Sequence, residues 1–285
     1  MSFDGVEELT RPTSLAEAWA QKEEGGEEAR FIASGIDLAV FAPPSVKRLI
    51  DLGGLGLSYV REEDGGIGIG TTTTMTEIGE SPLVQGYAGG FLATVIRRVA
   101  SPLQRNLATF GGTLGTLHPW SDIVPALLVL DADLVVYDGE KGVVPLSDYL
   151  KRRGEGFRPL ITEIRLPRIS DTAGAAFEKF TRTRFDIGLL NCACFVELRD
   201  GRCETLRIAI GGRPAIATRL GEIEGEWEGG TFNREAIERI AGLAAERADL
   251  RDDLRASAGY RRTLAKVGVK RCLERIAEGL EGGDR

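Results

Sequence analysis

Apolar and polar positions recur along this chain with two different spacings, and the spacing predicts which element each segment forms. In the helix-like segments apolar residues return about every three to four positions, as on one face of an amphipathic helix. These segments are residues 12–22, 89–100, 234–246 and 253–278. A further helix is expected at residues 121–130, where the run from Ile123 to Leu130 is apolar without interruption. Shorter runs alternate or are continuously apolar, which is typical of strands. These runs are residues 30–32, 48–52, 59–60, 66–70, 134–137, 160–166, 176–180, 191–198 and 205–210.

The order of these elements changes near residues 168–175. Before this segment helices and strands alternate, and after it three strand-like runs are followed by helices. We therefore expect an α+β protein with two domains. Residues 1–170 would form the first, with two α/β subdomains that divide near residues 55–60. Residues 171–285 would form the second, an antiparallel sheet backed by helices.

Two glycine-rich turns are the most informative local features. The first follows a strand at residues 33–37 (Ala-Ser-Gly-Ile-Asp), and the second occupies residues 108–115 (Ala-Thr-Phe-Gly-Gly-Thr-Leu-Gly). Glycine lets backbone N–H groups approach a bound group closely, and such groups commonly surround a phosphate. Two turns of this kind could hold one dinucleotide from two sides. The glycines of residues 66–70 lack the third glycine of a dinucleotide fingerprint, so we interpret this run as a closely packed strand.

Charge limits the partners that the chain could bind. Its 285 residues include 36 Lys and Arg against 43 Asp and Glu, a formal net charge of −7. Nucleic-acid binding needs clustered basic residues, so we expect none. The basic runs at 151–153 and 260–262 are interpreted as solvated faces or helix ends. No apolar run reaches the roughly 18 residues of a membrane span, and the N-terminus lacks signal-peptide features, so we expect a cytoplasmic protein.

The cysteines and the single histidine indicate no metal site and no acid–base centre. The spacing of Cys192, Cys194, Cys203 and Cys272 matches no zinc or iron–sulfur pattern. Cys192 and Cys194 share one face of a probable strand, so small core residues are the simpler interpretation for these two. His118 has no partner carboxylate or nucleophile in its motif. An iron–sulfur cluster would therefore have to come from another chain.

Several longer motifs occur in a characteristic order. They are residues 31–38, 104–114, 119–126 and 177–182, the pair Asp186-Ile187, and residues 253–262. Together they resemble the FAD-binding medium subunit of the molybdenum hydroxylases, the family of xanthine dehydrogenase and carbon monoxide dehydrogenase. The resemblance covers nearly the whole chain.

The resemblance implies a fold and a role. The first domain would be the two-part flavin-binding fold shared with vanillyl-alcohol oxidase-like enzymes, and the second a three-stranded antiparallel sheet with helices. The chain would bind FAD, next to a small subunit with [2Fe–2S] clusters and a large molybdopterin subunit, in a dimer of heterotrimers. Electrons would pass from the clusters through FAD to an external acceptor. The flavin would be the redox group, so no side chain is expected to be catalytic.

The resemblance also assigns cofactor contacts. The first turn would contribute Ile32, Ala33, Ser34, Gly35, Ile36 and Asp37 to the FAD diphosphate, and the second Thr109, Phe110, Gly111, Gly112, Thr113 and Thr116. His118 would contact the cofactor through its backbone, and Ile161 would touch the adenine in the same way. Asp122 would accept hydrogen bonds from the adenosine ribose. Lys179 would lie near the flavin, where a cation favours the anionic reduced form.

Departures from the family pattern keep other interpretations open. Ser34 and Ile36 replace a glycine and a polar residue of the first turn, and Thr113 replaces an asparagine of the second. Asp37 could simply cap a helix, as could Ser121 or Asp122, and Lys179 could belong to a solvated strand face. The chain could then be a nucleotide-binding assembly or scaffold subunit with weak or no flavin redox activity. A free-standing flavin oxidase is a third possibility.

Overall fold

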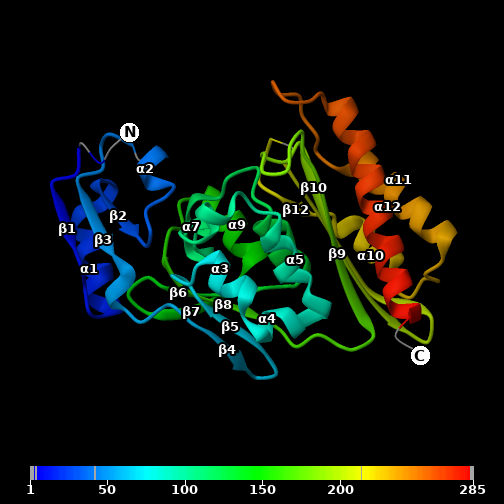
Figure 1. Ribbon diagram of the computed structural model, residues 1–285, viewed down its shortest axis with the longest axis horizontal. Coiled ribbons are helices and arrows are strands. Elements are labelled where there is room, and N and C mark those ends of the chain that lie inside the picture. Colours follow the sequence, from blue (N-terminus) through cyan, green and yellow to red (C-terminus); the bar gives the residue numbers. More distant parts are fainter. Residues whose placement is uncertain (1–2, 4, 42, 213, 283–285) are drawn as a thin grey trace. The chain divides into compact units, whose positions relative to one another are not determined.

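The computed structural model describes residue 3 and residues 5–41, 43–212 and 214–282 (Figure 1). By its internal contacts the chain forms two compact units. Unit 1 comprises Met1–Ser81, Ser101–Thr116 and Ala132–Leu166. Unit 2 comprises Pro82–Ala100, Leu117–Asp131 and Pro167–Arg285. Two segments that precede residue 170 in the sequence therefore pack into unit 2.

Unit 1 begins with a small parallel sheet in the order β1-β3-β2. Its elements are β1 (Glu8–Thr10), α1 (Leu15–Gly25), the 3-10 turn Gly26–Glu28, β2 (Ala29–Ile32), α2 (Leu38–Phe41), β3 (Arg48–Asp51) and the 3-10 turn Leu52–Gly54. Helix α1 packs on this sheet through Ala18, which shares a core with Ala29 and Ile50. Ser14 caps the start of this helix, and its Oγ accepts a hydrogen bond from Glu17 N at 3.1 Å. The Glu17 carboxylate accepts from Thr13 N, one residue earlier than a capping box requires.

The second sheet of unit 1 has five antiparallel strands in the order β4-β5-β8-β6-β7. Its elements are β4 (Val60–Glu63), β5 (Gly66–Gly70), α3 (Met75–Glu80), α6 (Pro102–Arg105), α7 (Phe110–Thr116), β6 (Asp133–Tyr137), β7 (Lys141–Pro145), α9 (Leu146–Gly154) and β8 (Leu160–Leu166). Strand β5 is buried along its whole length, as predicted for a closely packed strand. A Cβ at Gly70 would stand 2.2 Å from the Leu57 carbonyl oxygen, so this position requires glycine.

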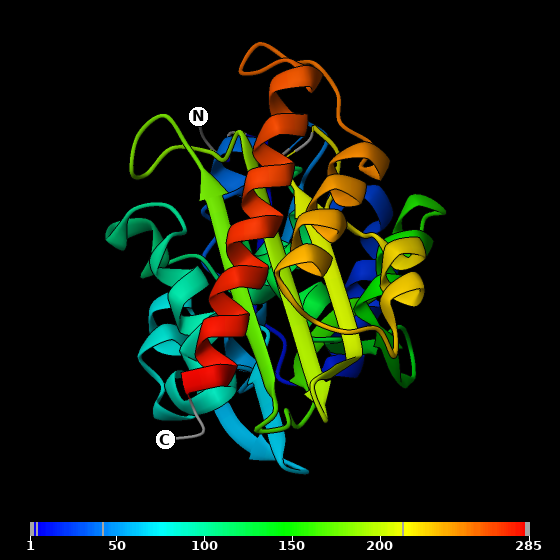
Figure 2. The same cartoon turned by 90° about the vertical axis from the view of Figure 1, so that its right-hand side faces the viewer.

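Unit 2 is built around an antiparallel sheet in the order β12-β11-β10-β9, part of which faces the viewer in Figure 2. Its elements are α4 (Pro82–Gly86), the 3-10 turn Tyr87–Gly90, α5 (Phe91–Arg97), α8 (Ile123–Val129), β9 (Ala173–Phe180), β10 (Leu190–Arg199), β11 (Arg202–Gly211), β12 (Thr218–Arg219), α10 (Gly221–Trp227), α11 (Arg234–Arg247) and α12 (Ala258–Gly282). The expectation of a three-stranded sheet is therefore wrong, because the described residues form a sheet of four strands. The additional strand is β12, which is only two residues long and pairs with β11. Such a short strand has no alternating apolar pattern by which the sequence could predict it.

The sheet of unit 2 is buried on both faces. On one face Cys192, Cys194 and Val196 of β10 share a core with residues of α11 and α12, which lie across the strands in Figure 2. On the other face Ala193 and Phe195 are also buried, and α8 contacts β10 and β11. The uninterrupted apolar run at 192–196 follows from this arrangement, because a strand covered on both faces has no solvent-facing positions there.

Candidate functional site

Unit 1 contains a cavity of about 340 Å³ whose wall includes both glycine turns. The first turn contributes Ala33, Ser34, Gly35, Ile36 and Asp37. The second contributes Thr109, Gly111, Gly112, Thr113, Gly115 and Thr116. Ile161 at the start of β8 also lines the cavity. Eleven of the residues predicted from the sequence as cofactor contacts therefore line one cavity.

The first turn connects β2 to the short helix α2. Gly35 has φ +76°, a left-handed conformation that favours glycine, and a Cβ there would lie 2.8 Å from Ile32 Cδ1. Ile32 thus packs beneath the turn and is not part of the cavity wall. Asp37 Oδ2 accepts a hydrogen bond from Thr116 Oγ1 at 3.3 Å, which joins the two glycine turns directly.

The second turn is a short helix instead of an open loop, because residues 110–116 form α7. Gly111 lets this helix approach Thr71: its N–H donates to Thr71 O at 3.0 Å, and a Cβ would stand 1.8 Å from Thr71 Oγ1. A Cβ at Gly115 would meet no protein atom within 4 Å, so this backbone is open to the cavity that it lines. Phe110 is fully buried and anchors α7 in the core, so its side chain is unavailable to a ligand.

Charged residues that the sequence motifs did not identify also line the cavity. They are Lys22, Glu27, Arg30, Arg153 and Arg158. The run at 151–153 is indeed the last turn of α9, as predicted for a helix end, but it is not simply solvated. Arg153 Nη2 donates to the Gly115 carbonyl at 2.9 Å. The position of Arg153 in the sequence, shortly before the predicted adenine contact Ile161, is a signal that could have identified it.

Asp122 and Lys179, which the resemblance assigns to ribose and flavin, form an ion pair in unit 2. Lys179 Nζ lies 2.6 Å from Asp122 Oδ2, and each side chain is only 5% exposed. Asn191 Nδ2 donates to the other Asp122 oxygen at 2.8 Å. Burial raises the pKa of Asp122, although the positive charge of Lys179 opposes this shift. Lys179 therefore does not belong to a solvated strand face.

The start of α8 shows which residue caps it. Ser121 Oγ accepts a hydrogen bond from Val124 N at 3.3 Å, whereas Asp122 makes no side-chain cap bond. His118 precedes this cap in unit 2, and its ring stacks on Trp120 with 4.6 Å between centroids. Neither His118 nor Asp122 is among the residues that line the cavity of unit 1.

The four cysteines are buried residues with free thiols, and each lies in the core of unit 2, as expected for Cys192 and Cys194. Burial raises the pKa of the Cys192 and Cys194 thiols well above the ordinary value. Within the described residues, no group of three or more His, Cys, Asp or Glu side chains is arranged to hold a metal ion.

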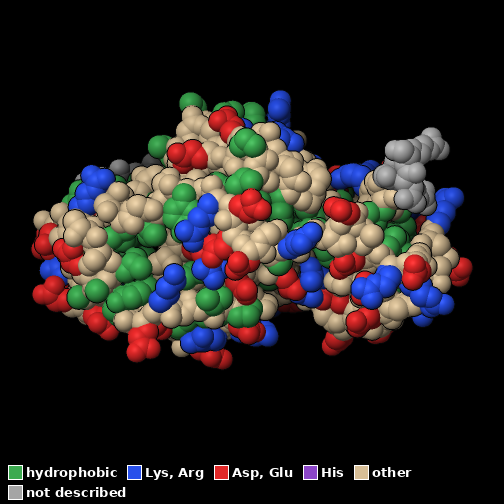
Figure 3. All heavy atoms as spheres, turned by 90° about the horizontal axis from the view of Figure 1, so that it is seen from below, with side chains coloured by type: hydrophobic (Ala, Val, Ile, Leu, Met, Phe, Trp, Pro, Cys, Tyr) green, Lys and Arg blue, Asp and Glu red, His purple; other side chains and the backbone are tan. Residues whose placement is uncertain are grey.

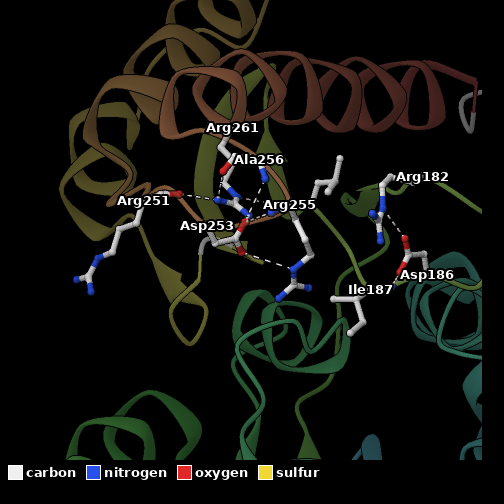
Figure 4. Close-up of polar contacts among 9 residues, drawn as sticks. Arg182, Asp186, Ile187, Arg251, Asp253, Arg255, Ala256 and Arg261 are labelled. Atoms are coloured by element: carbon white, nitrogen blue, oxygen red, sulfur yellow. Dashed lines mark hydrogen bonds and ion pairs between the residues drawn. The ribbon is translucent and has the colours of Figure 1, made fainter.

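The basic run at 260–262 contains a buried arginine, so its interpretation as a solvated face is wrong for Arg261. This side chain is fully buried and donates to the Leu189 carbonyl at 2.9 Å and to Asp253 Oδ1 at 2.7 Å (Figure 4). Burial alone would raise the pKa of Asp253, but the hydrogen bond from Arg261 helps to lower it below the ordinary value. Arg182 and Asp186 form an ion pair, with Nε and Oδ2 2.9 Å apart.

On the face seen in Figure 3, acidic and basic side chains are intermixed, without a continuous basic area. Among the described segments, every helix is too short or too polar to cross a membrane.

Comparison with known proteins identifies the class of protein as an oxidoreductase subunit with an FAD-binding domain. Residues 2–169 match the family "FAD binding domain in molybdopterin dehydrogenase", and residues 175–276 match "CO dehydrogenase flavoprotein C-terminal domain". The chain belongs to this family of FAD-binding subunits of molybdenum hydroxylases. The resemblance found in the sequence motifs is thereby confirmed, as is FAD as the cofactor of the family domain.

Individual relatives span nearly the whole chain. The carbon monoxide dehydrogenase medium chain of Hydrogenophaga pseudoflava is 30% identical over 93% of this chain and 95% of its own length. The xanthine dehydrogenase FAD-binding subunit of Escherichia coli O157:H7 is 26% identical over 90% of this chain and 91% of its own. A solved structure of the Hydrogenophaga pseudoflava carbon monoxide dehydrogenase superimposes with a TM-score of 0.84 at 28% identity, covering 94% of this chain and 96% of the other. These relatives favour a redox subunit over a scaffold.

Proposed function

We propose that the cavity of unit 1 binds the adenosine and diphosphate of FAD between the two glycine turns. The observation that carries this proposal is that both turns, 79 residues apart at Asp37 and Thr116, line one cavity and are joined by a hydrogen bond. Ile161 lines the same cavity, which supports its predicted contact with the adenine through the backbone.

The residues present fit a dianionic diphosphate. Four cationic and two carboxylate side chains line the cavity, which leaves a net charge of +2. Gly115 leaves its backbone open to the ligand, because no protein atom occupies the space where a Cβ would stand. Ser34 is exposed in the wall and its hydroxyl can donate to phosphate, whereas Ile36 could contribute only its backbone. The substitution at residue 34 is therefore compatible with cofactor binding.

Asp122 and Lys179 stay predicted contacts of ribose and flavin. A carboxylate has about four acceptor sites, and an ammonium has three donors. Two hydrogen bonds to Asp122 and two from Lys179 are in use, the second of the latter to the Arg98 carbonyl. The Asn191 Oδ1 atom beside this pair is buried and has no partner among the described residues, so an additional hydroxyl donor would find an acceptor. Ile32, Phe110 and His118 would take part through their backbone alone.

We place the chain as the electron-transfer subunit of a heteromeric molybdenum hydroxylase in the cytoplasm. Bound FAD would supply the redox chemistry, and the residues of this chain would bind and orient it and set the local charge. Electrons would arrive from [2Fe–2S] clusters of a small partner subunit, next to a large molybdopterin subunit in a dimer of heterotrimers. They would leave to an external acceptor. The relatives support this assignment because their names are those of medium chains and FAD-binding subunits of dehydrogenases.

The proposal is tested by purifying the chain, adding FAD and recording the visible spectrum after removal of excess cofactor. We expect flavin absorbance at one FAD per chain, and a colourless protein would contradict the proposal. Purification of the native complex should bring down an iron–sulfur protein and a molybdopterin protein. Reduction of an added acceptor by that complex, without peroxide formation by the isolated chain, would separate the redox subunit from a free-standing oxidase.

A further inference from the structure

The wall of the unit 1 cavity carries positive charges that come from residues outside the two glycine turns. Arg30 is neutralised by Glu27, with Nη2 and Oε2 3.2 Å apart. Arg153 and Arg158 line the same cavity but form no ion pair with any residue that the structure describes. Two positive charges of the wall therefore lack a protein counter-charge in contact with them.

Arg153 is the more informative of the two. It stands in the last turn of α9, and its Nη2 donates to the Gly115 carbonyl of α7 at 2.9 Å. Its Nη1 atom is buried and has no hydrogen-bond partner in the described part of the chain. A buried charged donor without an acceptor is unfavourable, and proteins rarely keep one unless something else supplies the acceptor. Arg153 also lines the cavity, so a ligand there could supply this acceptor once the guanidinium group turns toward it.

The other charges of the wall indicate the sign of this ligand. The pKa of Lys22 is lowered, first by burial and then by the positive charge of Arg30, with a further contribution from Arg158. The cations of the wall thus repel one another, and an anion between them would relieve the repulsion. Arginine also suits a phosphate group geometrically, because its planar fork can donate two parallel hydrogen bonds.

We infer that Arg153 is a direct ligand of the cofactor diphosphate and, together with Arg158, gives the cavity its preference for ADP-containing anions. This inference rests on the proposed function, since it takes the cavity to be the FAD site. Arg153 would thus have two roles. It fixes the end of α7 through Gly115, and it presents its second nitrogen to a phosphate oxygen.

The test measures binding of FAD and of ADP to the purified full chain by calorimetry, at low and at high sodium chloride. Arg153→Gln should weaken both ligands at least about tenfold at low salt, because one charge-assisted hydrogen bond is lost. The difference from wild type should shrink at high salt, since screening weakens the remaining electrostatic part. Arg153→Lys should recover part of the affinity, because it keeps the charge but loses the fork. Arg158→Gln should weaken both ligands less than Arg153→Gln does.

Lys151→Gln is the matched control. Lys151 lies on the same helix and its loss removes the same charge, but its side chain is 76% exposed and paired with Asp148. We expect its affinities to stay within about twofold of wild type, because surface charges contribute little. Circular dichroism of each variant without ligand shows that α9 is intact. Should Arg153→Gln fail to fold, the Arg153→Lys and Arg158→Gln variants still measure the contribution of the wall.

Different failures have different meanings. Arg153→Gln binding as tightly as Lys151→Gln would overturn the inference. So would an affinity loss that is equal at all salt concentrations and is not recovered by Arg153→Lys, because that result indicates a structural role through Gly115 alone. If the wild type bound ADP but not FAD, the proposed function would fail while the role of Arg153 could still be measured. If the wild type bound neither ADP nor FAD, both the proposed function and the inference about Arg153 would be contradicted.

Discussion

The cavity of unit 1 and the buried polar cluster of unit 2 arrange their charges in opposite ways. In unit 2, Asp122 is held by Lys179 at 2.6 Å and by Asn191 at 2.8 Å. In unit 1, Arg153 and Arg158 line a cavity without an ion-pair partner among the residues described. In the cluster of unit 2 the opposite charges neutralise each other, whereas the cavity of unit 1 has an excess of positive charge.

This difference separates charges that are already paired within the protein from charges that would be available to the proposed ligand. Removing one member of a buried pair leaves the other charge unpaired, so such residues matter first for stability. A cation beside a cavity already lacks its partner, so its removal should affect binding more than folding. The family pattern assigned the paired residues to the cofactor and did not include the unpaired ones.

The largest effect should come from breaking the cluster of unit 2. Asp122→Leu leaves the Lys179 ammonium buried without its counter-charge, and we expect a loss of about 3–5 kcal/mol in the free energy of unfolding. The double variant Asp122→Leu/Lys179→Met should recover most of this loss, because no isolated charge remains. Urea unfolding followed by circular dichroism measures both. A single variant as stable as wild type would show that this pair does not hold the fold.

The next effect concerns the backbone of the second glycine turn. Gly111→Ala would force its new Cβ against Thr71 and should destabilise unit 1 by roughly 1–3 kcal/mol. Gly115→Ala meets no protein atom within 4 Å and replaces a glycine within α7, so its stability should equal or slightly exceed that of wild type. If the diphosphate lies at this backbone, Gly115→Ala should nevertheless weaken FAD binding. Thermal unfolding and FAD titration of the two variants measure these outcomes, and unchanged FAD affinity in Gly115→Ala would place the diphosphate elsewhere.

A smaller effect links the cavity to pH. Burial raises the pKa of Tyr149, which lines the cavity, to about 12, although the positive charge of Arg158 opposes this shift. A tyrosine whose pKa is higher in the folded state than its unfolded value of about 10 favours folding below that pH. This contribution should be lost as the pH rises from about 10 towards 12. Comparing wild type with Tyr149→Phe by ultraviolet titration of phenolate and by unfolding at alkaline pH tests this, and a Tyr149 that ionises near pH 10 would contradict it.

The smallest effect is expected at the exposed ion pair of unit 2. Arg182 is 63% exposed, and its partner Asp186 is 23% exposed. Arg182→Gln should change the free energy of unfolding by less than about 0.5 kcal/mol, because water and salt screen such pairs. Urea unfolding of Arg182→Gln and Asp122→Leu under the same conditions compares their free energies of unfolding. A loss as large as that of the buried pair would mean that burial does not separate the two classes of charge.

The sequence predicted much of the fold because many elements carry their own periodic pattern. The helix expected at 234–246 is observed as Arg234–Arg247, and the strand expected at 160–166 as Leu160–Leu166. Strands β7 and β12 were missed because neither has an alternating apolar run. The helix expected from residue 253 begins only at Ala258, since the Asp253 carboxylate accepts from the backbone N–H groups of Arg255 and Ala256 and holds the preceding segment as a loop.

The sequence by itself determined the family, the cofactor class and the two glycine turns, because each of these motifs is a short run of residues whose types and order are visible along the chain whatever the surroundings. Only the tertiary structure decided which charges are satisfied. Lys179 and Arg261 are buried and paired, while Arg153 lies beside a cavity with one nitrogen unpaired in the described chain. The reason is physical: the state of a charge depends on its burial and on partners far away in the chain, and the partner of Lys179 lies 57 residues earlier.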